Sequence, residues 1–230
     1  MHYEHLFVYR GSVVSPALIQ PARPALVEVA GRARPVVLAG ERRLPVPGPL
    51  GDLLPGGGLQ RGTVVSVEGA GGTGGASVVL AFLAAATAVG EWAAVIDAEE
   101  SFGPLAAAEA GVALERLAVV RLRDVPERFG QVVATLLEGM TVVAVTVPRQ
   151  MRAAEARRLL ARAREQGSVL VAAGGWPGEV ALRLRAEGSA WSGLGRGEGL
   201  LGARTLRVTV AGRGAAGRER TAEVPLRAAS

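Results

Sequence analysis

Residues 63–76 read TVVSVEGAGGTGGA, a β-branched strand that runs into a glycine-rich turn and is followed by an apolar helix. This is the arrangement of a phosphate-binding loop, whose pattern G-x-x-x-x-G-K-[ST] falls on Gly69, Gly74, Gly75 and Ala76. Gly75 occupies the position of the lysine that neutralises phosphate, and Ala76 occupies that of the hydroxyl that holds Mg²⁺. The stretch therefore predicts a nucleotide-binding scaffold without the side chains for hydrolysis.

The composition limits both the chemistry and the partners. No lysine can replace the missing one, because all 26 basic side chains of this 230-residue chain belong to arginine. The net charge of +5 makes nucleic acid or an acidic protein a candidate partner. The chain has no cysteine, which excludes disulfides and cysteine metal sites. It shows no secretory signal and no apolar run long enough to span a bilayer, so we expect a cytoplasmic protein without a membrane partner.

The hydrophobic pattern beyond the loop predicts the fold class. Strands that are apolar on both faces alternate with helices, which is typical of a parallel sheet covered on both sides. The predicted strands cover 63–67, 92–96, 117–120, 141–147 and 168–173, and the predicted helices cover 77–89, 103–111, 125–138 and 150–166. After Gly175 the period changes to two, as expected for antiparallel strands with one solvated face. We therefore expect an α/β fold with a mainly parallel sheet, helices on both faces and C-terminal antiparallel strands.

The chain divides into three predicted regions. Residues 1–50 are rich in proline and form an N-terminal extension. Residues 51–211 form the core. Residues 212–230 form a C-terminal tail that is either a partner-binding segment or, over 221–226, the last strand of the sheet.

The order of the elements and several local words resemble the RecA fold. They are residues 62–90, the segment VIDAE at 95–99 and the segment AGVALERL at 110–117. Within that superfamily the chain resembles the ImuA family, in particular its actinobacterial ImuA-prime branch. The words that carry this likeness are LLPGGGLQRG at 53–62, GGWPG at 174–178, WSGLGRGEG at 191–199 and ARTLRV at 203–208.

The resemblance implies an accessory role in DNA-damage tolerance. ImuA proteins belong to a damage-inducible mutagenesis cassette for translesion synthesis. They work with ImuB, a polymerase-like Y-family protein that lacks catalytic residues, and with an error-prone replicative-type polymerase. The implied partner is thus an ImuB-like Y-family polymerase homologue, with RecA, the error-prone polymerase and DNA as further candidates.

The same resemblance identifies the acidic positions of the ancestral site. Thr146 occupies the strand-end position where such proteins hold Mg²⁺ with an aspartate. Glu99 matches the water-activating glutamate, and Asp97 lies beside it; we expect both to be solvated remnants. Together with Gly75 and Ala76 these losses predict a protein that is not an enzyme and has no cofactor or metal.

The C-terminal region carries the candidate partner or DNA contacts. Its basic residues face only Glu187, Glu198 and Glu219 over the same stretch, and Trp191 could either stack on a base or cover the core. We expect a protein interface rather than single-strand binding, because no Tyr or Phe lies nearby. The candidates are Arg183, Arg185, Trp191, Arg196, Arg204, Arg207, Arg213, Arg218 and Arg220.

Two other functions remain open on the sequence alone. The first is a SulA-like inhibitor of cell division that binds FtsZ, since SulA is also a RecA-like domain without a working phosphate loop. The second is residual nucleotide binding by the glycine-rich turn. The complete strand–helix core and the segment 95–99 favour the ImuA-like interpretation.

Overall fold

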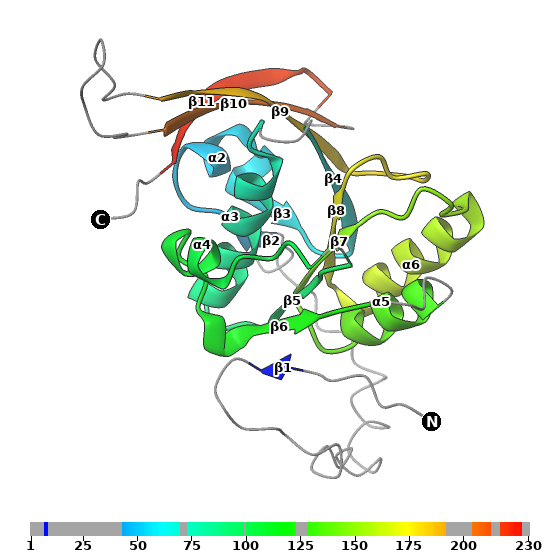
Figure 1. Ribbon diagram of the computed structural model, residues 1–230. Helices are drawn as coiled ribbons and strands as arrows, with labels where there is room; N and C mark the ends of the chain where they lie inside the picture. Colours follow the sequence, from blue (N-terminus) through cyan, green and yellow to red (C-terminus); the bar gives the residue numbers. More distant parts are fainter. Residues whose placement is uncertain are drawn as a thin grey trace, which may run out of the picture.

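The computed structural model describes residues 7–8, 43–69, 73–98, 100–122, 128–191, 204–212 and 217–226. These residues form a nine-stranded sheet with the order β1-β6-β5-β7-β8-β4-β9-β10-β11 (Figure 1). The strands are β1 (Phe7–Val8), β4 (Thr63–Glu68), β5 (Ala93–Ile96), β6 (Leu117–Val120), β7 (Val142–Thr146), β8 (Val169–Ala173), β9 (Leu182–Trp191), β10 (Arg204–Gly212) and β11 (Arg220–Leu226). The pairs from β6 to β9 are parallel, whereas β9, β10 and β11 are mutually antiparallel. The predicted fold class is confirmed.

Helices cover the two faces of the parallel part of the sheet. One face packs on α2 (Gly48–Leu53), α3 (Gly75–Ala88) and α4 (Pro104–Glu109), and the other packs on α5 (Phe129–Leu137) and α6 (Ala153–Gln166) (Figure 1). Neighbouring residues of β4 serve the two faces, because side chains alternate along a strand. Val65 lies in the cluster of Phe82, and Val64 lies in that of Val133 and Leu160. This two-sided burial explains the continuous apolar runs in the sequence.

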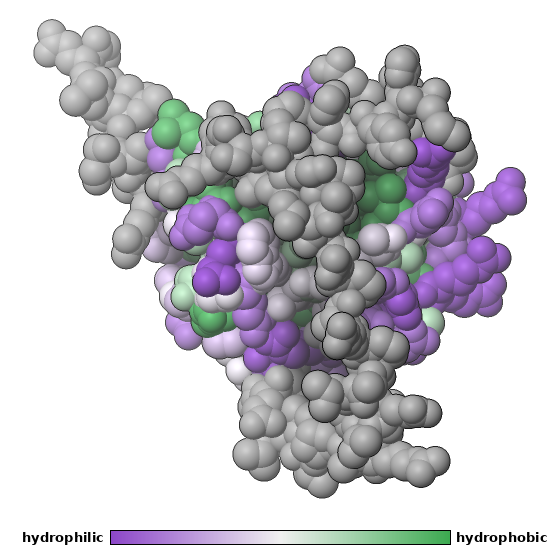
Figure 2. All heavy atoms as spheres, turned by 90° about the horizontal axis from the view of Figure 1, so that it is seen from below, coloured by the Kyte–Doolittle hydropathy of each residue, from purple (hydrophilic) through white to green (hydrophobic). Residues whose placement is uncertain are grey.

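Helices α5 and α6 are joined at their exposed sides by charged groups. The guanidinium of Arg162 donates hydrogen bonds to Glu138, just after α5, and to Glu165 one turn along α6. These bonds, the one to Glu138 first, raise the pKa of Arg162 above its usual value, so it stays charged wherever the protein is folded. Hydrophilic side chains gather on this side of the molecule (Figure 2).

Several predicted boundaries differ from the structure by a few residues. Helix α3 begins at Gly75, two residues before the predicted start, because Gly74 already acts as its N-cap. Helix α6 begins at Ala153 rather than at 150, because Pro148 and Met151 close a turn that precedes it and Arg152 is extended. The first residues predicted for α5, 125–127, lie outside the described residues.

The region before residue 51 contributes to the core. Strand β2 (Arg43–Pro45) pairs with β3 (Gly58–Gln60), and a 3-10 turn (Pro55–Gly57) connects α2 to β3. Leu44, Val46 and Leu50 are buried in the same cluster as α3. Of the N-terminal extension predicted over 1–50, residues 1–6 and 9–42 lie outside the described residues.

Part of the predicted C-terminal tail forms the last strand. Seven residues of β11 pair with β10, and Val224 is buried in the main cluster. Residues 213–216 and 227–230 lie outside the described residues. None of the helices in the described part of the chain has the length and apolar character needed to cross a lipid bilayer.

Candidate functional site

The glycine-rich loop between β4 and α3 is held by contacts with the rest of the fold. Gly74 has left-handed backbone, with φ 102°, and a Cβ at this position would collide with Leu206 of β10. A Cβ at Gly69 would lie 2.6 Å from Thr73 Oγ1. Residues 70–72 of the loop lie outside the described residues. At Gly69 and Gly74, therefore, packing alone accounts for glycine, with no need for a phosphate.

The first turn of α3 carries no side chain that could hold a nucleotide. Gly75 and Ala76 stand where the phosphate-loop pattern has lysine and serine or threonine, and Ala76 is exposed. A Cβ at Gly75 would meet Val67 Cγ1 at 3.9 Å, an ordinary contact, so the fold has room for a longer side chain there. The turn keeps its backbone N–H groups, which favour an anion only weakly. It supplies neither a cation for the phosphates nor a ligand for Mg²⁺.

Thr146 ends β7 at the carboxyl edge of the sheet, where ligands of open α/β sheets bind. Its side chain is exposed, and β8 separates β7 from β4 and its loop. A threonine hydroxyl is neutral and a poor replacement for the carboxylate that holds Mg²⁺. In the described part of the chain, no group of three His, Cys, Asp or Glu side chains is arranged to hold a metal ion.

Asp97 is buried rather than solvated, which corrects the expectation for this position. Its side chain is 6% exposed. One carboxylate oxygen accepts a hydrogen bond from the backbone N–H of Ser101 at 2.9 Å, and the other accepts from Phe102 at 3.2 Å. Asp97 thus closes the turn that leads from β5 to α4. Glu99 lies outside the described residues.

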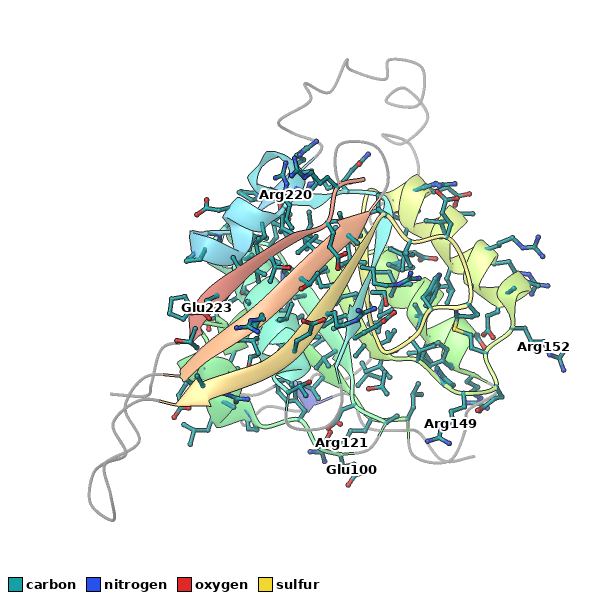
Figure 3. All side chains as sticks on the ribbon, turned by 90° about the horizontal axis from the view of Figure 1, so that it is seen from above. Glu100, Arg121, Arg149, Arg152, Arg220 and Glu223 are labelled. Atoms are coloured by element: carbon teal, nitrogen blue, oxygen red, sulfur yellow. The ribbon has the colours of Figure 1, made fainter. Side chains whose placement is uncertain are left out.

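Two arginines that the sequence analysis did not select lie at the same edge of the sheet. Arg121 follows β6 and Arg149 follows β7, and both are exposed. Figure 3 shows them on the side of the molecule where Glu100 also lies. Glu100 has left-handed backbone, with φ 55°, an uncommon conformation for a residue with a side chain.

The exposed side of β9, β10 and β11 brings several of the predicted contact residues together. We call this surface the outer face; its reverse side packs on the main cluster through Leu184, Leu206 and Val208. The outer face comprises Arg183, Arg185, Glu187, Ala190, Thr205, Arg207, Thr221 and Glu223. The predicted placement of Arg183 and Arg185 on one face of their strand is confirmed.

The arginines of the outer face are paired with carboxylates. Arg183 Nε lies 3.0 Å from Glu68 Oε1, which links β9 to the end of β4. Arg185 lies 3.7 Å from Glu187 along β9, and Arg207 lies 3.6 Å from Glu223 across β10 and β11. The expectation that the basic residues face only Glu187, Glu198 and Glu219 is therefore wrong. The three arginines and three glutamates balance, so this face lacks the positive excess of a nucleic-acid surface.

The remaining candidates do not join this surface. Arg204 is half-buried at the start of β10, and Trp191, the last residue of β9, is its cross-strand neighbour. Arg218 and Arg220 are exposed at the opposite end of β11 (Figure 3). Arg196 and Arg213 lie outside the described residues.

The outer face also contains a groove that the sequence analysis missed. The groove has a volume of about 260 Å³ and is lined by Glu187, Gly188, Ala190, Thr205, Arg207 and Glu223. It lies where the pairing of β9 with β10 shifts register, at a bulge in which Gly188 has φ 86°. An isolated glycine in an alternating strand pattern is the signal that could have predicted it.

One comparison with known proteins identifies the family. The family model described as the MT3502 N-terminal domain matches residues 52–178, more than half of the chain. The chain therefore belongs to this family. None of the curated proteins matches it. The matched residues include the glycine-rich loop, Asp97 and Thr146, and they end before the outer face begins.

Proposed function

We propose that this member of the MT3502 N-terminal domain family is a non-catalytic adaptor that binds another protein on a RecA-like scaffold. The observation that carries the proposal is the first turn of α3, where Gly75 and Ala76 replace both functional side chains of a phosphate loop. Thr146 at the end of β7 removes the third. A fold that keeps the loop geometry by internal packing has no need of the nucleotide for its stability.

The resemblance to ImuA supports a specific partner and process. We infer an accessory role in translesion synthesis, with an ImuB-like Y-family polymerase homologue as the partner. RecA and an error-prone replicative-type polymerase are further partners of such an assembly. The charge balance of the outer face favours protein contacts over direct DNA binding there, because DNA-binding surfaces carry a positive excess.

Affinity capture of the tagged chain from cells with damaged DNA, followed by mass spectrometry, tests this proposal. The adaptor function predicts recovery of a polymerase-like Y-family protein. Recovery of FtsZ without any polymerase would overturn it and support the SulA-like function instead. A tagged E187Q/E223Q chain and an untagged sample, processed in parallel, separate contacts of the outer face from adsorption.

A further inference from the structure

The groove on the outer face has the size and lining of a site for one side chain. Its volume of about 260 Å³ is below the roughly 300 Å³ at which pockets for small molecules begin. Gly188, Ala190 and Thr205 are small, and they leave the backbone of β9 and β10 open beneath it. The bulge at Gly188 adds a residue to β9 opposite Arg207, and such bulges redirect the neighbouring side chains.

The charges around the groove favour a cation. Glu187 and Glu223 line it from β9 and β11, and Arg207 lies between them on β10. Two carboxylates and one guanidinium leave the lining with an excess of negative charge. The side chains of Glu187 and Glu223 are 41% and 68% exposed, so both carboxylates are accessible to a partner.

The existing ion pairs of these carboxylates leave them available. Arg185 and Glu187 are 3.7 Å apart and Arg207 and Glu223 are 3.6 Å apart, both longer than a charge-assisted hydrogen bond. Exposed pairs of this kind contribute little to stability, because water and salt screen them. A partner's cation can therefore take up either carboxylate without a large loss elsewhere in the fold.

We propose that the groove between Glu187 and Glu223 receives an arginine or lysine side chain of a partner protein. The charge complementarity of the lining identifies this occupant, and phosphate groups would be repelled by the same two carboxylates. The inference rests on the proposed adaptor function for its biological role, since it describes the contact by which the adaptor holds its partner.

Nuclear magnetic resonance of the full chain tests the groove without any knowledge of the partner. The probe is N-acetyl-arginine methylamide, and N-acetyl-glutamate methylamide is the comparison. We expect saturable shifts of the Gly188, Ala190 and Thr205 amides with the arginine probe alone. In E187Q/E223Q the binding should weaken by about threefold to tenfold. The matched control E109Q changes an exposed glutamate of α4 in the same way and should bind as the unmodified chain does.

The outcomes separate this inference from the proposed function. Shifts that are absent, that lie elsewhere, or that persist unchanged in E187Q/E223Q overturn the groove even if the chain captures a Y-family protein. Shifts as expected, together with failure to capture that protein, overturn the proposed partner and leave the groove standing. Thermal unfolding of each variant shows whether the substitutions leave the fold intact.

Discussion

The side chain of Leu206 packs against Gly74 in the space that a Cβ at position 74 would need. The contact joins the turn before α3 to β10, two segments far apart in the sequence. It shows that the C-terminal strands help to fix the phosphate-like loop. The loop is thus part of the packed core on one side, whatever it binds on the other.

Substitution of the two neighbouring glycines should have opposite consequences. We expect Gly74→Ala to lower the free energy of unfolding by about 1–3 kcal/mol, because it combines left-handed backbone with a collision at Leu206. Gly75→Ala should be neutral or stabilise by up to about 1 kcal/mol, because Gly75 lies in the helix and has room for a Cβ. Urea denaturation measures both, and equal effects would contradict the packing described for the loop.

Restoring the phosphate-loop side chains should not restore catalysis. The double variant G75K/A76T is expected to fold, since position 75 has space and position 76 is exposed. Neither it nor the unmodified chain should hydrolyse ATP in the presence of Mg²⁺, because Thr146 provides no carboxylate for the metal. Phosphate release over hours measures this. Turnover by the unmodified chain would disprove the non-catalytic function.

Asp97 should stabilise the fold without any metal. Asp97→Ala leaves the buried N–H groups of Ser101 and Phe102 without their acceptor, which should cost about 1–3 kcal/mol. Asp97→Asn keeps one acceptor oxygen and should cost less. Unfolding is followed with Mg²⁺ and with a chelator, and neither should change the ranking. If chelation destabilised the unmodified chain but not Asp97→Ala, Asp97 would be a metal ligand instead.

Strand β11 should be required for the fold. A chain that ends at residue 216 loses all seven pairs with β10 and the buried Val224, so it should melt at a lower temperature or without cooperativity. A chain that ends at residue 226 keeps the strand and should melt like the full chain. Circular dichroism compares the two. A stable chain ending at 216 that had lost only partner binding would instead identify residues 217–226 as a docking tail.

The fold could be predicted from the sequence because its signals are local. The strand over 117–120 and the two-sided apolar runs follow from periodicity, which each segment carries by itself. The details of the site depend on pairing between distant segments. Arg183 meets Glu68 only because β9 lies parallel to β4 in a particular register, and periodicity does not specify that neighbour. Asp97 looked solvated because no pattern indicated that the chain would turn back over its carboxylate.

The central claim, that this chain is a non-catalytic adaptor, is tested most directly by one binding measurement. Biolayer interferometry of the purified chain with the purified ImuB-like homologue, with and without ATP and Mg²⁺, gives two dissociation constants. The account predicts saturable binding with constants that agree within about twofold, because a scaffold without nucleotide chemistry has no coupling to the nucleotide. No binding, or binding that depends on ATP, would contradict it.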